Sequence, residues 1–371
     1  MSAEPIRATR AAAPRALVGG PSLTRAGVVL GGGIVLLVAI GGVAVASGSV
    51  GIDPGQTLGI IVHRLTGIGS GRAWTPQAET IVWDLRLPRV VAAMVVGGGL
   101  AMAGAAFQAL LRNPLADPYI IGTAAGASLG AVAALVLPAL VPGFAVLAGG
   151  SWLGIGMVQV AAFGGGLGTV LLVYAVARGA RGGAVTLLLT GYAVSSMLAA
   201  GVALLMYLSG NRLGVIFSWL MGSLDVAEWR SLALAAPIVV VSLLALLARW
   251  RRLNVLLLGD MQAAHLGVEV GRERFVLTVL ASLATSAVVA VSGTIGFVGL
   301  VVPHVLRLAI GPDHRLLLPA SVVYGAALLT LADLGARLAG GIPVGIVTAL
   351  VGAPFFIWLL VRARGTGTVG P

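Results

Sequence analysis

The sequence contains no cysteine, and all 23 of its basic residues are arginine. Without cysteine, the chain can form no disulfide, no thiolate metal site and no cysteine nucleophile. Charged residues make up 9% of the chain, whereas an ordinary soluble domain carries about 25%. Most of the 12 acidic residues lie near the ends of apolar segments, and none lies in the middle of one. A transporter driven by an ion gradient usually needs such a residue inside the membrane, so its absence favours an external energy source.

The motifs of several enzyme classes are also missing. The four histidines, His63, His265, His304 and His314, show no metal-ligand spacing such as HExxH. There is no phosphate-binding loop of the form GxxxxGKS or GxxxxGKT, so the chain itself is not expected to bind ATP. We therefore predict that this protein is not an enzyme, that it has no catalytic residue, and that it binds no metal or cofactor.

Apolar segments dominate the sequence, which is 58% hydrophobic and has a mean hydropathy of +1.06. A helix needs about 20 apolar residues to cross a membrane, so the 371 residues have room for about ten such helices. The 55 glycines favour close helix contact in lipid. The predicted fold class is all-α, a polytopic membrane protein with about ten transmembrane helices. The predicted spans are 26–47, 88–111, 119–141, 152–177, 185–208, 231–250, 275–294, 296–310, 316–336 and 343–362.

The arginines determine the predicted orientation, because sixteen of them lie on one side of the spans and seven on the other. By the positive-inside rule, the more basic side is cytoplasmic, and both termini lie on that side. The net charge of +11 could also suggest nucleic-acid binding, but arginines that flank apolar spans favour membrane orientation instead. The seven arginines on the outer side are Arg64, Arg72, Arg86, Arg89, Arg212, Arg230 and Arg337.

One transmembrane domain is predicted, at residues 26–364, between a disordered cytoplasmic tail at 1–25 and a second cytoplasmic tail at 365–371. Residues 26–47 could instead belong to a signal peptide. Their apolar run of about 20 residues is longer than the hydrophobic region of a signal peptide, so we expect an uncleaved first helix. In the outer segment 209–230, Trp219 and Trp229 indicate short helices at the membrane surface.

Three of the outer arginines could bind a partner. Arg86 and Arg89 lie on the same side of a helix start, and Arg337 ends the ninth span on the same face of the membrane. A guanidinium group binds a carboxylate with two hydrogen bonds, so these residues are candidates for docking acidic residues of an external partner. The alternatives are that they reach lipid headgroups, or that they pair with Asp84 and Asp333 nearby.

Two proline dipeptides, Asn113-Pro114 and Asp117-Pro118, break the chain between the second and third spans. Proline removes a hydrogen-bond donor and disfavours helix at the residue before it, so a tight loop is predicted on the inner side. Asn113 and Leu115 could also narrow the inner mouth of a pathway.

The inner segment Leu258–Arg274 is more polar than the spans. Asp260 is a good N-cap, Met261 to Leu266 are typical of a short helix, and Gly267 is a good residue to end it. Such a helix could lie in a groove of a partner protein or rest on the membrane surface.

Several motifs in one order resemble the permease subunits of binding-protein-dependent (type II) ABC importers for ferric siderophores, haem and vitamin B12. The resemblance extends from the second span to the end of the chain. The motifs are RLPR (86–89), NPLADP (113–118), LGDMQAAHLGV (258–268), GFVGLVVPHVLR (296–307), GPDHRLLLP (311–319), LADLGARL (331–338) and PVGIVTALVGAPFFIWLL (343–360).

The resemblance implies a homodimer in the cytoplasmic (inner) membrane, with a translocation path at the dimer axis. It implies two ATP-binding cassette subunits on the inside, which carry ATP and Mg, and a periplasmic or lipid-anchored substrate-binding protein on the outside. Arg86, Arg89 and Arg337 would meet glutamates of the binding protein, and Asn113 and Leu115 would belong to a cytoplasmic gate. The helix in contact with the ATPase would comprise Gly259, Asp260, Met261, Gln262, Ala263, Ala264, His265, Leu266 and Gly267.

The expected cargo is a metal chelate, with a ferric siderophore favoured over vitamin B12 or haem. The competing class is an ion-coupled secondary transporter, which would need no ATPase.

Overall fold

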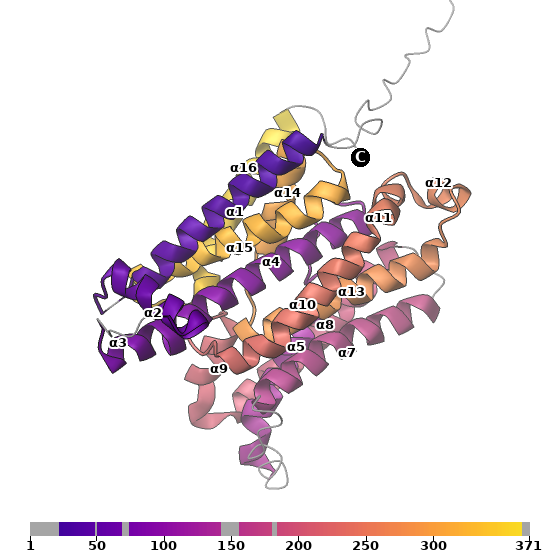
Figure 1. Ribbon diagram of the computed structural model, residues 1–371. Coiled ribbons are helices and arrows are strands. Elements are labelled where there is room, and N and C mark those ends of the chain that lie inside the picture. The colour runs from indigo at the N-terminus through magenta and orange to yellow at the C-terminus, as the bar shows by residue number, and fades with distance from the viewer. Residues whose placement is uncertain (1–21, 49, 69–73, 142–155, 180–183, 366–371) are drawn as a thin grey trace, which may run out of the picture.

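The computed structural model describes residues 22–48, 50–68, 74–141, 156–179 and 184–365, and all regular structure in them is helical (Figure 1). The all-α class is therefore confirmed. Eight helical segments within these residues are long and apolar enough to cross a membrane. They are α1 (Leu23–Ala46), the continuous segment Pro76–Leu110, α5 (Thr123–Leu140), α7 (Met157–Gly179), α8 (Ala184–Leu208), α10 (Trp229–Ala248), α13 (Val270–Ser292) and α15 (His314–Leu338).

Two shorter apolar helices, α14 (Val298–Ile310) and α16 (Val344–Gly365), correspond to the eighth and tenth predicted spans. Within the described residues, every predicted span thus coincides with a helix, apart from a few residues at its ends, and residues 152–155 of the fourth span lie outside the described residues. Residues 1–21 and 366–371 of the predicted tails lie outside the described residues.

The other helical pieces among the described residues are short, and they either extend a span or lie between two spans. The segment Pro76–Leu110 consists of α3 (Pro76–Thr80), the π-helical turn η2 (Ile81–Arg86) and α4 (Leu87–Leu110). The others are α2 (Pro54–Thr66), η3 (Gly210–Arg212), α9 (Leu213–Leu220), α11 (Trp250–Leu256) and α12 (Asp260–His265). The short helices predicted within 209–230 and 258–274 are therefore present, as α9 and α12.

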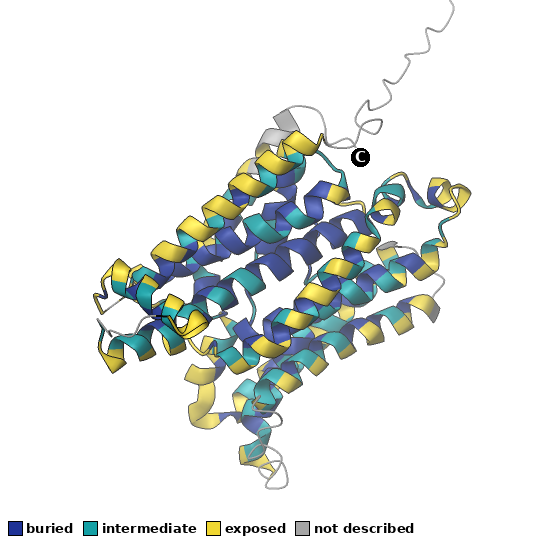
Figure 2. Cartoon of the chain, viewed as in Figure 1, coloured by how far each residue is buried: buried dark blue, intermediate teal, exposed yellow. Residues whose placement is uncertain are grey.

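Helix α4 runs through the centre of the bundle (Figure 2). In the segment that contains α4, 83% of the most apolar 18-residue stretch is buried within the protein, whereas the corresponding share in α8 is 17%. Glycine makes this position possible, because a Cβ at Gly104 would lie 1.7 Å from the carbonyl oxygen of Gly299 in α14. A Cβ at Gly97 would lie 2.3 Å from the carbonyl oxygen of Gly325 in α15. Any larger residue at either position would push a neighbouring helix away from α4.

Replacing Gly104 with alanine is expected to lower the free energy of unfolding. Overpacking of a core typically costs about 1–3 kcal/mol, and we expect the upper part of this range because the methyl group would meet backbone atoms. Thermal unfolding of the detergent-purified protein measures the change. Gly164→Ala on α7 is the matched control, since a Cβ there meets nothing within 4 Å. Equal losses in the two variants would contradict the packing argument.

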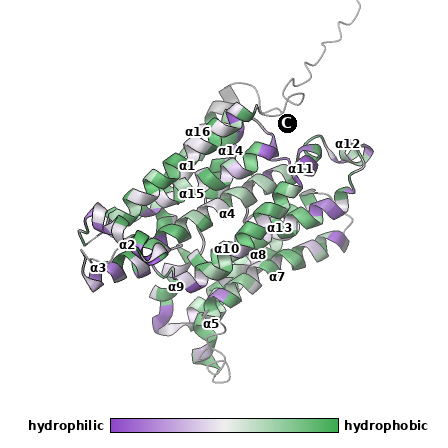
Figure 3. Cartoon of the chain, in the orientation of Figure 1, coloured by the Kyte–Doolittle hydropathy of each residue, from purple (hydrophilic) through white to green (hydrophobic). Residues whose placement is uncertain are grey.

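Hydrophilic residues gather at the two ends of the bundle (Figure 3). One end contains α11, α12 and the first turn of α13, and we call it the arginine-rich end because the arginines of the more basic side that the structure describes lie there. At this end a nitrogen of Arg25 donates to the carbonyl of Ala309 at 3.1 Å, and the amide of Asn254 donates to Asp313 at 2.8 Å. These contacts bring the start of α1, the end of α14, α11 and the start of α15 together. The opposite end contains α2, α3 and α9 (Figure 1).

Candidate functional site

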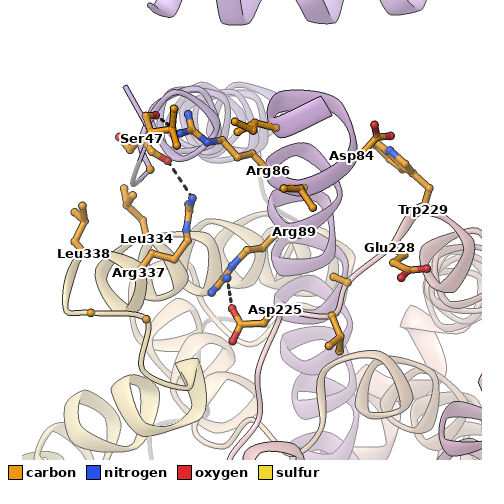
Figure 4. Close-up of a pocket in the computed structure, with 18 of the residues that line it drawn as sticks. Ser47, Asp84, Arg86, Arg89, Asp225, Glu228, Trp229, Leu334, Arg337 and Leu338 are labelled. Carbon is orange, nitrogen blue, oxygen red and sulfur yellow. Dashed lines mark hydrogen bonds and ion pairs between the residues drawn. The ribbon is translucent and has the colours of Figure 1, made fainter. Parts of the chain in front are cut away.

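A cavity of about 1200 Å³ lies at the end of the bundle opposite the arginine-rich end (Figure 4). Its walls come from the end of α1, the turn η2 with the start of α4, the α9–α10 loop and the end of α15. All three arginines predicted to dock a partner, Arg86, Arg89 and Arg337, line this cavity. The fold therefore brings together residues that are far apart in the sequence.

Arg86 is the last residue of η2 and is buried, with 6% of its surface exposed. Its guanidinium donates to the carbonyl oxygens of Val45 at 3.2 Å and Ala46 at 3.0 Å, and also to that of Val50. Val45 and Ala46 form the C-terminal end of α1, where a helix has unpaired carbonyls and a partial negative charge. Arg86 therefore attaches the end of α1 to the central helix.

Arg89 and Arg337 hold a buried carboxylate between them. Nη2 and Nε of Arg89 lie 2.8 and 2.9 Å from one oxygen of Asp333, and Nε of Arg337 lies 3.1 Å from the other. The Asp333 side chain is 1% exposed, so its charge has to be compensated, because an uncompensated buried charge is strongly destabilising. The ion pairs of Arg89 and Arg337 with Asp333, which the sequence left open as an alternative to docking, are therefore present. Asp84 lines the cavity but pairs with none of the three arginines.

The outer side of Arg89 has a second acidic partner, Asp225 of the α9–α10 loop (Figure 4). The Asp225 side chain is 51% exposed, contacts Nη1 of Arg89, and accepts a hydrogen bond from the Ser223 hydroxyl at 2.7 Å. The backbone N–H of Ser223 donates to the carbonyl of Ser292 at 2.9 Å, which ties this loop to the end of α13. Arg89 thus has one buried carboxylate partner and one that solvent can reach.

Arg230 is a further cavity residue that is not among the three predicted docking arginines. It is exposed near the start of α10, lines the cavity, and makes no ion pair with any described residue. In the sequence, the one feature that pointed to a docking role for Arg230 was its place among the seven arginines on the outer side. Nothing in the spacing of the sequence could place Asp225 beside Arg89, or Arg230 in the same cavity, because the three residues come from different helices and loops.

The segment predicted to contact an ATPase forms α12 at the arginine-rich end. Gly267, with a φ of 81°, follows the end of this helix as predicted. The N-cap predicted at Asp260 is wrong by one residue, since Gly259 is the N-cap and Asp260 begins the helix. The Asp260 carboxylate instead pairs with Arg274 at 2.9 Å and with Arg112 at 3.2 Å, so each of its two oxygens has a cationic partner.

Apolar side chains of α12 and the residue after it face outward. Met261 is 73% exposed and Leu266 is 62% exposed, while Ala263 is buried against the rest of the protein. A short helix with this exposed surface fits either a groove in a partner or the membrane surface, the two possibilities that the sequence left open.

The connection between α4 and α5 is the tight loop that its two proline dipeptides predicted. Oδ1 of Asn113 accepts a hydrogen bond from the N–H of Leu115 at 2.9 Å. Oδ1 of Asp117 accepts one from the N–H of Tyr119 at 2.8 Å. Both are turns in which a side chain bonds the backbone two residues further on. Asn113 is exposed and Leu115 is half-buried, and their role in a gate stays a prediction.

This loop is attached to α12. Arg112 begins the loop in a left-handed conformation, with a φ of 49°, and its side chain reaches the Asp260 carboxylate. The two segments for which inner functions were predicted, residues 113–115 and α12, therefore lie side by side at the arginine-rich end.

Asp117 gives a pH-dependent prediction, because burial raises the pKa of its carboxyl from 3.8 to about 6. The folded protein then binds more protons than the unfolded chain between about pH 4 and pH 6, so the folded state loses stability as the pH rises through this range. Asp117→Asn keeps the acceptor for Tyr119 but carries no charge. We expect the variant to be more stable at pH 8, by up to about 3 kcal/mol, and equally stable at pH 4. Thermal unfolding at both pH values tests this, and the same change at both would contradict it.

Comparison with known proteins identifies the family of this chain. Residues 35–362 match the FecCD transport family. The chain is 47% identical over 285 residues to the cobalamin import system permease protein BtuC of Halobacterium salinarum, covering 76% of this chain and 74% of that protein. It is 40% identical over 299 residues to the hemin transport system permease protein HmuU of Yersinia pestis, covering 78% and 87%.

The fold agrees with these sequence matches. A solved structure described as an inward-facing conformation of a metal-chelate type ABC transporter superposes with a TM-score of 0.76 and 31% identity. The match covers 90% of this chain and 99% of that one. The chain therefore belongs to the FecCD transport family, as a membrane permease of an ABC importer in which a separate chain hydrolyses ATP.

Proposed function

We propose that this permease moves a metal chelate across the cytoplasmic membrane, driven by ATP hydrolysis on two partner subunits. The observation that carries the proposal is the placement of two candidate partner sites at opposite ends of one bundle. The cavity with Arg86, Arg89 and Arg337 lies at one end, and α12 lies at the other. The positive-inside rule supports a cytoplasmic location for the arginine-rich end, with both termini on that side.

The names of the relatives support a metal chelate as the cargo class. Cobalamin, hemin and a metal chelate are the cargoes in the names quoted above. None of these names mentions a siderophore, so the sequence-based preference for a ferric siderophore receives no added support. We therefore propose a metal chelate, with cobalamin, haem and a ferric siderophore as the three cargoes to compare.

A homodimer with the path at its axis is part of the proposal. Helix α8 supports the homodimer, because only 17% of its most apolar 18-residue stretch is buried within the protein. Its exposed apolar side chains could contact a second copy or lipid. They include Val185, Leu189, Met197 and Leu204.

At the outer cavity, we propose that docking of a binding protein exchanges one carboxylate for another. Arg89 is already paired with Asp225, so an acidic residue of a partner can reach its outer nitrogen only by displacing Asp225. Asp333 is too buried to be displaced in this way, and it would keep Arg89 and Arg337 in position throughout. The exposed Arg230 would add attraction for an acidic surface.

Asp225→Ala is therefore expected to tighten docking, because it removes an internal competitor. An exposed ion pair is worth up to about 1 kcal/mol, which corresponds to about a fivefold lower Kd for the binding protein. Surface plasmon resonance with the immobilised permease complex measures the change. Asp84→Ala is the control, since Asp84 lines the same cavity and does not pair with Arg89. Equal effects of the two substitutions would indicate a general electrostatic effect and contradict the exchange.

At the inner end, we propose that α12 lies in a groove of the ATPase subunit. The ion pair between Arg112 and Asp260 supports a coupling route, because a displacement of α12 would pull on the loop that contains Asn113 and Leu115. Gating by that loop would then follow the state of the ATPase.

Reconstitution tests the whole proposal. The permease is copurified with the ATPase encoded beside it, and ATP hydrolysis in proteoliposomes is measured with binding proteins loaded with each of the three chelates. Stable assembly and a rate changed by one loaded binding protein would support the importer and identify its cargo. Flux of a chelate without ATP or an ATPase would instead favour the ion-coupled secondary transporter.

A further inference from the structure

A second cavity, of about 870 Å³, lies at the arginine-rich end between α7, α8 and α13. The last turns of α7, Leu187 of α8 and the first turns of α13 form its walls. It is separate from the outer cavity and from the loop at residues 113–115. Its side chains combine a basic rim with an apolar wall.

Three arginines form the basic rim, and their charge is only partly compensated. Arg178 is exposed and makes no ion pair with any described residue. Arg272 faces Glu269 at 3.9 Å, with both side chains about three-quarters exposed. Arg274 binds Asp260 through one nitrogen, but its Nε is buried without a hydrogen-bond partner. Glu269 is the one carboxylate among the described lining residues, so the rim favours an anion.

The start of α13 adds to this preference. The helix begins at Val270, and its N-cap Glu269 makes no capping hydrogen bond through its side chain. Gly271 and Arg272, in the first turn, line the cavity. A helix N-terminus carries a partial positive charge and unpaired N–H groups, and this 23-residue helix therefore supplies further donors for an anion.

The other wall of the cavity is apolar. Leu171, Ala175 and Phe275 line it, and Phe275 packs on Tyr174 with ring centroids 4.7 Å apart. The outer surface of α7 next to this wall also consists of exposed apolar side chains, among them Leu172 at 47% and Val176 at 52%. Exposed apolar side chains on a spanning helix are suited to contact lipid tails, so the apolar wall continues into a surface that lipid can cover.

We propose that this cavity binds an anionic phospholipid. Arg178, Arg272 and the first N–H groups of α13 hold the phosphate, and the start of an acyl chain lies against Leu171, Ala175 and Phe275. Basic pockets between helices at the cytoplasmic side are suited to such headgroups. Since Arg274 also pairs with Asp260, the bound headgroup lies next to the base of α12. The site depends on the cavity alone and not on the docking or coupling roles proposed above.

Native mass spectrometry of the full-length chain in neutral detergent tests the proposal, with phosphatidylglycerol, phosphatidylcholine and inorganic phosphate as probes. We expect phosphatidylglycerol to bind, and the double variant Arg178→Gln/Arg272→Gln to weaken its binding by at least about tenfold. The control Arg251→Gln/Arg315→Gln removes the same charge at the same end, where both arginines lie over Trp250 outside the cavity. Equal weakening in the two double variants would overturn the site.

Ala175→Trp separates a lipid from a free anion. The substitution fills part of the apolar wall and leaves every charge in place. Losing the contact of about two acyl CH₂ groups is expected to lower phosphatidylglycerol binding by about tenfold as well. Unchanged lipid binding in this variant, or competition by inorganic phosphate alone, would overturn the assignment to a lipid. Ala175 and Arg178 are exposed, so each variant is expected to keep the unfolding temperature of the parent, which is measured alongside.

Discussion

Asp333→Ala is expected to cause a large loss of folding stability. Arg89 and Arg337 are 16% and 13% exposed, and the substitution would leave both without their shared carboxylate. Removing one partner from a buried ion pair typically costs about 3–5 kcal/mol, because the remaining charge stays buried. We therefore expect a large drop in unfolding temperature and poor recovery of the protein from membranes.

Asp225→Ala is the matched control for this experiment, because Asp225 pairs with the same Arg89 but is 51% exposed. An exposed pair contributes about 0–1 kcal/mol, so the control should unfold close to the parent. If the two variants lost equal stability, the structural role assigned to the buried carboxylate would be wrong.

Ala264→Arg is expected to abolish assembly with the ATPase and, with it, ATP-driven transport. Ala264 is exposed on α12, so a larger side chain there should change the folding free energy by no more than about 0.5 kcal/mol. At the centre of an interface, a bulky unpaired charge would exclude the partner, and we expect about a 100-fold or greater loss of affinity. Copurification with the ATPase and the transport rate measure the two effects.

Ala339→Arg provides the comparison for this substitution. Ala339 is an exposed alanine that follows α15 at the opposite end of the bundle, and it receives the same added charge. This control should copurify with the ATPase as the parent does. Normal assembly of Ala264→Arg would show that α12 does not lie in the ATPase, and would favour the membrane-surface alternative.

The contacts that Arg86 and Arg89 make within the protein make charge reversal at these residues a poor test of docking. Charge reversal at Arg86 would place a carboxylate against the carbonyls at the end of α1, and reversal at Arg89 would place one against Asp333. Either change would disturb the fold before any partner bound. Asp225 and Arg230 are the better positions for a docking experiment, because both are exposed and replacing either leaves the contacts of Asp333 and of the end of α1 in place.

The order of apolar segments, charges and helix breakers in the sequence was enough to predict the ten spans and the clustering of arginine at one end. It also predicted the loop at Asn113 to Pro118 and the short helix that ends before Gly267. These features depend on local properties, since hydropathy, the missing N–H of proline and the left-handed conformation of glycine act over a few residues.

Only the tertiary structure decided which charges are free and which are paired. From the sequence, Arg86, Arg89 and Arg337 were predicted to face outward as one group. In the folded protein, their side chains contact Asp333, Asp225 and backbone carbonyls. The same is true of Asp260, whose carboxylate pairs with two arginines and does not cap α12. The energy of a charge depends on burial and on partners within a few ångströms. The packing of helices around α4 determines both the burial and the partners of these charges. It brings together segments that are far apart in the chain, so the residue spacing within one segment does not predict it.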